Sequence, residues 1–202
     1  MLSIDPKTNT ERENYKLLIG SIIPRPIAFV TSVSEDGTIN AAPFSYFNVV
    51  SSNPPMISLS IQRRKGQMKD TARNILDKKE FVVHSVDDEN LKDINETAAS
   101  LRPDESEIEL TGLTLIESEK IGVPGIAESK VRMECILEKH LPLGEGEDIS
   151  TDLIIGRIVR FHIDERIYEK GRIDPVALGA MARLAGISYA SIGEITEMIR
   201  PD

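Results

Sequence analysis

The sequence predicts a single domain over residues 1–202, mainly β with peripheral helices and folded as an antiparallel β-barrel. Successive apolar segments joined by short turns indicate hairpins, which favour antiparallel sheets that close into barrels. No G-x-G-x-x-G run lies between a strand and a helix, so a Rossmann domain is excluded. The 202 residues, 40% of them hydrophobic, can bury one substantial core, and nothing in the chain requires a second domain.

The first hairpin is the clearest predicted element. Residues 27–33 and 39–44 form two apolar segments, and Asp36-Gly37 between them supplies the positive φ angles of a tight turn. The two segments are therefore predicted to pair as antiparallel strands. The same turn argues against a flavodoxin-like phosphate loop at residues 31–34, because a strand and not a helix follows it.

A loop, a third strand and a helix are predicted next. Residues 45–47 should form a short loop that Asn53-Pro54-Pro55 closes, and residues 56–61 form a strand. Asp70-Thr71 is typical of an N-cap and first helical turn, and the apolar Ile75 follows at helical spacing. We therefore expect a helix there, with the Asp70 side chain as its cap and the Asp70 N–H free to face an anion.

Basic residues are concentrated just before this helix, in a chain whose net charge is −9. Arg63, Arg64, Lys65 and Lys69 lie within seven positions, beside a helix N-terminus whose unpaired N–H groups and macrodipole also attract anions. The segment is therefore a candidate phosphate site. The alternative is a solvated basic turn, which is the expectation for Arg64 and Lys65 in particular.

The second half of the chain continues with strands and shorter helices. A helix carrying Leu91, Ile94 and Ala98 is expected after the acidic cap Asp87-Asp88-Glu89. Residues 100–128 are predicted mostly as an acidic loop with a short strand at 113–116. The other predicted strands are residues 81–86, 131–141 and 153–163, the last of them after the turn Gly144-Glu145-Gly146, and a final helix is predicted from Pro175 to Leu184.

Three features that could carry other chemistry are interpreted as structural. His84, His140 and His162 are far apart and form no H-x-x-x-H pair, so no metal site is predicted. Cys135 falls at an inward position of an alternating strand, where a free cysteine is usually a small buried apolar residue. Ser129 lacks the G-x-S-x-G context of a serine hydrolase.

The tail carries Arg183 and Tyr189 six residues apart around Gly186. Gly186 is expected to end the last helix, which places Arg183 in its final turn and Tyr189 beyond it. Two interpretations are open. Either Arg183 caps the helix and Tyr189 packs on the barrel, or the segment closes over a ligand pocket with Tyr189 as an aromatic wall.

Several segments occur in an order that one known family shares. They are PRPIAFVTS at 24–32, GTINAAPFSYF at 37–47, KDTARNI at 69–75, IAES at 126–129, EC at 134–135 and ARLAGISY at 182–189. Together they resemble the flavin reductase-like family of FMN-binding split barrels, in particular its flavoredoxin branch. The resemblance covers nearly the whole chain, and it departs from the family's usual Arg-x-Gly-Gly-x-x-Tyr tail only at Ala185, which replaces the first glycine.

This resemblance implies a split barrel that binds FMN. The phosphate would lie against Arg63, Lys69 and Thr71, and the ring edge would lie against Thr31 and the Phe44-Ser45-Tyr46 segment. The expected cofactor-binding residues are Thr31, Asn40, Phe44, Ser45, Tyr46, Ser60, Arg63, Lys69, Asp70, Thr71, Arg183 and Tyr189.

The function implied by the resemblance is an FMN-dependent oxidoreductase of the NAD(P)H:flavin reductase type. Hydride would pass from the nicotinamide to the flavin, so the protein positions the two rings and no catalytic acid or base is assigned. No dinucleotide fingerprint is present to select NADH or NADPH. One alternative is an FMN-binding electron carrier without NAD(P)H activity, and another is a cofactor-free interaction barrel.

Charge and hydropathy bear on partners and location. A net charge of −9 argues against nucleic acid, whose binding depends on a basic face. No apolar run approaches the roughly 18 residues that span a bilayer, and residues 1–6 lack the features of a signal peptide, so a cytoplasmic protein without membrane contact is expected. The resemblance further implies a homodimer with flavin at its interface, since a barrel of this size has a narrow interior.

Overall fold

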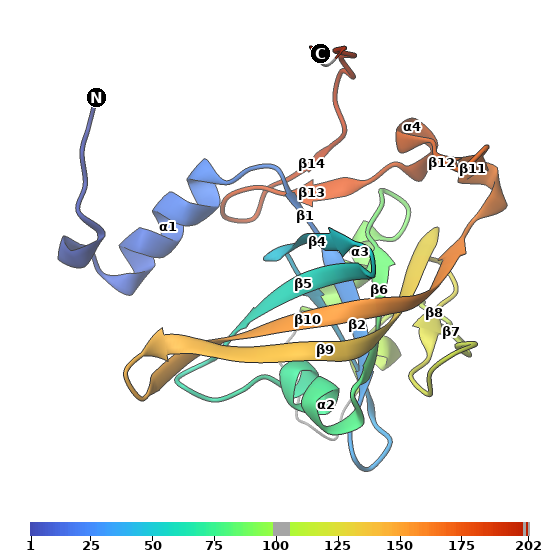
Figure 1. Ribbon diagram of the computed structural model, residues 1–202, viewed down its shortest axis with the longest axis horizontal. Coiled ribbons are helices and arrows are strands. Elements are labelled where there is room, and N and C mark those ends of the chain that lie inside the picture. Colours follow the sequence, from blue (N-terminus) through green and yellow to red (C-terminus); the bar gives the residue numbers. More distant parts are fainter. Residues whose placement is uncertain (99–105, 200, 202) are drawn as a thin grey trace.

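Seven antiparallel strands form the main sheet of the computed structural model, which describes residues 1–98, 106–199 and 201 (Figure 1). The strands are β2 Ala28–Val33, β3 Ile39–Phe44, β4 Phe47–Ser52, β5 Pro55–Gln62, β6 Glu80–Ser85, β9 Val131–Glu145 and β10 Asp148–Ile163. They lie in the order β3-β2-β6-β9-β10-β5-β4, and each pairs antiparallel with its neighbours. The predicted mainly β, antiparallel architecture is confirmed.

The sheet is rolled so that its two edge strands approach each other. β3 and β4 lie at opposite edges, yet only Ser45 and Tyr46 separate them in the chain. Three Cα–Cα steps span at most about 11 Å, so the strand ends at Phe44 and Phe47 lie close together. The described strands form no ladder across this gap, so a chain crossing closes the barrel there.

The first predicted hairpin is confirmed. β2 pairs with β3 from Ala28 opposite Phe44 to Val33 opposite Ile39. In its turn Gly37 has a φ of +94°, and the Thr38 N–H donates to Asp36 Oδ1 at 3.1 Å. The Asp-Gly pair therefore forms the predicted turn with the backbone conformation that favours glycine.

Two other strand predictions need correction. The predicted loop at 45–47 is shorter, because Phe47 begins β4, an edge strand paired with β5. The sequence of this strand shows no apolar alternation that could have predicted it, and none of its side chains is fully buried in the structure. The β9–β10 hairpin also extends past the predicted turn, since Gly144 pairs with Ile149. Backbone pairing with a neighbouring strand decides both boundaries.

Four helices accompany the sheet: α1 Glu11–Ser21, α2 Asp70–Lys78, α3 Leu91–Glu96 and α4 Pro175–Leu178. Helix α1 is missing from the sequence-based prediction. It begins with a capping box, in which Thr10 Oγ1 accepts from the Glu13 N–H while the Glu13 carboxylate accepts from the Thr10 N–H at 2.8 Å. The T-x-x-E signature at residues 10–13 could have predicted this start.

The acidic segment before α3 does stabilise the start of that helix. Asp87 Oδ1 accepts from the N–H groups of Glu89 and Asn90 at 3.0 and 3.1 Å. Ile94 is buried as expected, whereas Ala98 lies beyond the end of the helix and is exposed. The helix is thus present but ends at Glu96, two residues before the last apolar residue that the spacing implies.

The last predicted helix, from Pro175 to Leu184, is wrong beyond Leu178. Gly179, with a φ of +65°, ends α4, and the chain continues as β13 Met181–Arg183 and β14 Tyr189–Ser191. β13 pairs with β14 and with β1 Arg25–Pro26. Arg183 therefore lies in a strand, and Gly186, with a φ of +62°, lies in the turn that follows. Pairing with β1, from the other end of the chain, overrides the local helical pattern.

The remaining elements are short. Of the predicted loop at 100–128, residues 100–105 lie outside the described residues, and the strand predicted at 113–116 is confirmed only at β7. No helix among the described residues is long and apolar enough to cross a membrane. The remaining short elements are the 3₁₀-helices η1 Pro6–Thr8, η2 Glu107–Leu110 and η3 Glu165–Ile167 and the strands β7 Leu115–Ile116, β8 Gly125–Ile126, β11 Tyr168–Glu169 and β12 Arg172–Ile173.

The barrel interior holds the larger of two hydrophobic clusters, and α2 contributes Ala72 and Ile75 to it. Cys135 belongs to this cluster and is fully buried, as predicted, and burial raises the pKa of its thiol. A glycine is required at position 156, because a Cβ at Gly156 would lie 2.3 Å from Cζ of the buried Phe81. The second cluster lies under α3 and includes Phe29, Ala41 and Ile126.

His84 is buried and neutral. Its Nε2 accepts from the Ile126 N–H at 2.9 Å, and its Nδ1 lies 2.9 Å from the Phe29 carbonyl oxygen, so Nδ1 carries the proton. Burial is the main reason that its pKa falls to about 4. A second proton would have to break the Ile126 hydrogen bond.

We therefore expect the free energy of unfolding to fall as the pH is lowered from about 6.5 to about 4. In this range His84 binds a proton in the unfolded chain but stays neutral in the folded protein. The loss from this residue is at most roughly 3 kcal/mol. Urea unfolding at several pH values, with His84→Gln as the comparison, measures it. Equal pH slopes in the two proteins would contradict the assignment.

Candidate functional site

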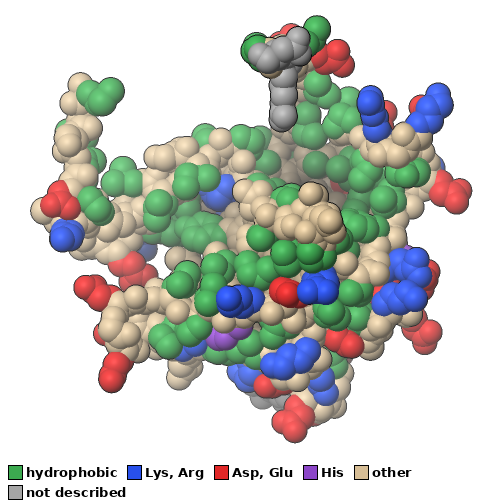
Figure 2. Space-filling model, in the orientation of Figure 1, with side chains coloured by type: hydrophobic (Ala, Val, Ile, Leu, Met, Phe, Trp, Pro, Cys, Tyr) green, Lys and Arg blue, Asp and Glu red, His purple; other side chains and the backbone are tan. Residues whose placement is uncertain are grey.

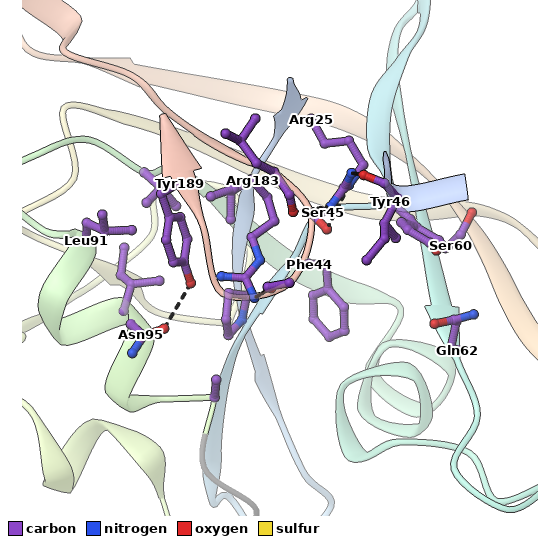
Figure 3. Close-up of a pocket in the computed structure, with 18 of the residues that line it drawn as sticks. Arg25, Phe44, Ser45, Tyr46, Ser60, Gln62, Leu91, Asn95, Arg183 and Tyr189 are labelled. Carbon is purple, nitrogen blue, oxygen red and sulfur yellow. Dashed lines mark hydrogen bonds between the residues drawn. The ribbon is translucent and has the colours of Figure 1, made fainter. Parts of the chain in front are cut away.

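A cavity of about 290 Å³ lies where the chain crosses between the two edges of the barrel. We refer to it as the edge pocket (Figure 3). Its walls come from the edge strand β3, the crossing segment, β5, α1, α3 and the β13–β14 hairpin, so segments far apart in the sequence meet here. The residues that line it include Tyr15, Ile19, Arg25, Phe44, Ser45, Tyr46, Ser60, Gln62, Lys69, Leu91, Asn95, Arg183, Leu184 and Tyr189.

The crossing segment and β5 form one wall of the edge pocket. The Ser60 N–H donates to the Tyr46 carbonyl at 2.8 Å, which holds the crossing against β5. Ser60 and Gln62 both line the cavity, as the period of two along a strand requires. The Tyr46 hydroxyl is buried without a hydrogen-bond partner among the described residues, and burial raises the pKa of Tyr46.

The tail forms the opposite wall. Arg183 and Tyr189 are paired across β13 and β14, and the guanidinium carbon lies 4.4 Å from the centre of the tyrosine ring. The Tyr189 hydroxyl donates to Asn95 Oδ1 on α3 at 2.9 Å (Figure 3). The hairpin is thereby tied to α3 across the cavity. Both tail residues proposed from the sequence line the pocket, although a strand pair and not a helix end positions them.

A second cavity adjoins the first at the N-terminus of α2, and we refer to it as the helix pocket. It shares Pro43, Phe44, Lys69 and Ala98 with the edge pocket. Arg64, Lys65 and Arg73 add positive charge to its lining. The first N–H groups of α2 receive no side-chain cap from the described residues, so they are available to an anion.

Lys69 lies at the junction of the two pockets. Its Nζ lies 5.7 Å from the centre of the Phe44 ring. Burial, together with the charge of Arg64, lowers the pKa of Lys69 below its usual value. An ammonium group at the start of a helix attracts an anionic group.

Asn40 and Thr71, both predicted site residues, are held by a buried network beside the helix pocket. The Thr71 hydroxyl donates to Asn40 Oδ1 at 2.7 Å. Asn40 Nδ2 in turn donates to both carboxylate oxygens of Glu107 at 2.9 and 3.0 Å, and the Ala41 N–H donates to the same group at 3.0 Å. The network fixes the first turn of α2 against β3, and its hydrogen bonds satisfy the Glu107 carboxylate.

The structure corrects the position of the basic residues. Arg63 lines neither pocket, because its guanidinium binds Asp152 through two hydrogen bonds of 2.9 and 2.8 Å. Burial would raise the pKa of Asp152, but the hydrogen bonds from Arg63 and His140 lower it below its usual value. Arg64 and Lys65 are exposed to solvent, as expected, and they also line the helix pocket.

Asp70 and Thr31 also differ from expectation. The N-cap of α2 is Lys69, and the Asp70 carboxylate pairs with Arg73 on the first turn and caps nothing. Thr31 is fully buried, lines neither pocket, and donates its hydroxyl to the Pro124 carbonyl at 2.7 Å. Phe44, Ser45, Tyr46 and Ser60 do meet in the edge pocket, as the sequence analysis proposed.

The sequence analysis missed several residues that line the edge pocket: Tyr15, Arg25, Gln62 and Asn95. Gln62 lies two residues after Ser60 on β5, so strand periodicity could have found it. Tyr15 was missed with helix α1. Arg25 and Asn95 carry no local signal, because the contacts that bring them to the pocket join distant segments.

Several known proteins are similar to this chain over nearly its whole length. Component B of nitrilotriacetate monooxygenase from Bacillus cereus is 59% identical, with a TM-score of 0.96 and 98% of each chain covered. YwrF of Bacillus subtilis is 54% identical over 193 residues, 94% of each chain. The 2-nitrobenzoate 2-nitroreductase NbaA of Pseudomonas fluorescens is 30% identical, with a TM-score of 0.88 over 99% of this chain and 96% of that one.

The fold and the family follow from these matches. A split barrel domain protein from Shewanella frigidimarina superimposes with a TM-score of 0.84 at 21% identity and 96% coverage of each chain, so the barrel is of the split type that the sequence predicts. The model of the flavin reductase like domain matches residues 19–178. This chain belongs to the flavin reductase-like family.

Proposed function

We propose that the protein binds FMN, with the ring in the edge pocket and the phosphate in the helix pocket. The observation that carries the proposal is the junction at Phe44 and Lys69, where an aromatic cavity meets a cationic one. FMN has the matching design of a flat ring joined by a polyol to a phosphate. Ser45, Ser60 and Gln62 offer hydrogen-bonding groups to a ring edge.

At the helix pocket the phosphate would be held by backbone and side chains together. The uncapped N–H groups at the start of α2 point toward such an anion, and Lys69, Arg64 and Lys65 supply charge. The Asn40–Thr71–Glu107 network keeps the helix start in place. The acidic Asp70 is neutralised by Arg73, so it does not oppose anion binding.

We further propose that the protein is an oxidoreductase that accepts electrons from NADH or NADPH. Bound flavin supplies the hydride-accepting chemistry. The side chains of the edge pocket orient the ring and exclude water from it, and no residue is required as acid or base. The likeness to a monooxygenase component B and to a nitroreductase supports a reductase. The second candidate is an electron carrier that binds FMN but has no NAD(P)H activity, and the same fold is compatible with it.

Anaerobic mixing with NADH or NADPH tests this function. We expect the purified protein to be yellow and its flavin absorption to bleach on addition of one or both nucleotides. A yellow protein that bleaches with dithionite but with neither nucleotide would support the electron carrier. A colourless protein that takes up no added FMN would exclude both functions.

We also propose a homodimer with flavin at the interface. Helix α1 projects from the barrel (Figure 1), and hydrophobic side chains gather over it and over the face beside it (Figure 2). Leu18, Ile22 and Val49 are 52%, 59% and 74% exposed. A surface of this kind favours association with a second apolar surface. Tyr15 and Ile19 of α1 also line the edge pocket, so an interface there would cover it.

Leu18→Glu is expected to convert the dimer to a monomer and to weaken FMN binding, because a charge would have to be buried in the interface. Sedimentation equilibrium with and without FMN measures both effects. Lys16→Glu is the control and should leave a dimer, because the exposed Lys16 is two residues before Leu18 and points to another side of the helix. A wild-type monomer near 22.4 kDa that retains full FMN would contradict the proposal.

A further inference from the structure

Arg25 is a buried charge that neither the fold nor the proposed chemistry explains by itself. Its side chain belongs to the two-residue strand β1 and is only 6% exposed. Among the described residues no carboxylate pairs with it. A buried guanidinium without a counter-ion is costly unless its donors are satisfied, so the identity of its partners is informative.

Its partners come from three segments of the chain. Nη1 donates to the carbonyl of Ile19 in the last turn of α1 and to that of Ile22, the C-cap residue, both at 2.8 Å. Nη2 donates to the Leu184 carbonyl, just after β13, at 2.9 Å. Nε approaches Ser45 Oγ at 3.4 Å in the barrel crossing. Four of the five N–H groups of the guanidinium are therefore used.

These partners are the walls of the edge pocket. Ile19, Ser45 and Leu184 all line the cavity, and so does Arg25 itself (Figure 3). Helix α1 has no basic residue in its last turn, so Arg25 also supplies the cation that the carbonyl end of a helix favours. One planar side chain thus joins a helix, a hairpin and the strand crossing around the same space.

We propose that Arg25 is the positioning residue of the edge pocket, which holds helix α1 and the β13–β14 hairpin at the separation that the flavin ring requires. The inference rests on the proposed function for the identity of the ring. It depends on the fork of the guanidinium and not on its charge alone, because a lysine ammonium group is a point charge that cannot reproduce the parallel donors.

The variants Arg25→Met and Arg25→Lys test it, with Arg12→Lys on the exposed side of α1 as the control. In ligand-free protein, hydrogen exchange should rise together at residues 19–22 and 181–191 in both Arg25 variants and in neither segment of the control. FMN and riboflavin should both weaken, and by the same factor of about tenfold or more, because the ring end of the ligand is affected. Wild-type affinity and protection in Arg25→Lys would overturn the proposal.

Four other outcomes are decisive. Faster exchange with unchanged flavin affinity would show that Arg25 is structural only, and loss of FMN affinity alone would place its effect at the phosphate. In the wild type, riboflavin should slow exchange in both segments together, by the reciprocity of linked equilibria, and protection of one segment alone would also overturn the proposal. This arm needs no variant to fold. A wild type that binds neither flavin refutes the proposed function, and the ligand-free exchange then still decides whether Arg25 joins the two segments.

Discussion

Lys69→Met is expected to weaken FMN binding by roughly 10- to 100-fold, and riboflavin binding by less than about threefold. Lys69 lies at the junction of the two pockets, beside the uncapped start of α2. A charge-assisted contact there stabilises a phosphate, which riboflavin lacks. Methionine keeps most of the apolar stem that packs near Phe44, so the comparison isolates the charge.

Quenching of flavin fluorescence measures both affinities. Lys78→Met, an exposed lysine at the other end of α2, is the matched control and should change neither. The FMN effect should also shrink as salt is raised, since part of it is electrostatic. Equal weakening of FMN and riboflavin in Lys69→Met would show that the phosphate does not bind in the helix pocket.

Truncation after Leu184 is expected to loosen FMN by about tenfold or more and to slow its reduction by NAD(P)H, while the barrel stays folded. The truncation removes Tyr189, whose ring stacks on Arg183 and whose hydroxyl donates to Asn95. One wall of the edge pocket is then open to water. The main sheet does not depend on this segment, because among the described strands β14 pairs with β13 and with no strand of the main sheet.

A second truncation, after Gly193, separates the wall from the rest of the tail. It keeps β14 and the Tyr189–Asn95 hydrogen bond, so we expect wild-type affinity and wild-type reduction rates. Stopped-flow absorbance gives the rates, and far-UV circular dichroism checks the fold. If the protein truncated after Leu184 is folded and keeps both the wild-type FMN affinity and the wild-type reduction rate, the tail is structural only.

Sequence alone was sufficient where a local pattern and its physical cause coincide. The hairpin around Asp36-Gly37 is an example, because the turn needs a glycine and the flanking segments are apolar. The inward position of Cys135 and the helix over residues 70–78 follow in the same way from period and spacing. The family motifs also predicted that Phe44, Ser45 and Tyr46 would meet Ser60 at one site.

The tertiary structure decided which of the basic side chains line the helix pocket. Four basic residues before α2 look equivalent in the sequence, yet Asp152, far away in the chain, binds Arg63 and leaves Arg64 and Lys65 at the helix pocket. The tail reads as a helix up to Leu184, yet pairing with β1 makes Arg183 part of a strand. Hydrogen bonds and ion pairs between distant segments have no signature in the local sequence, because the residues around one partner do not reveal which distant residue it will contact. For this protein, residue spacing determined the barrel and the start of α2, and long-range pairing determined the walls of the pocket.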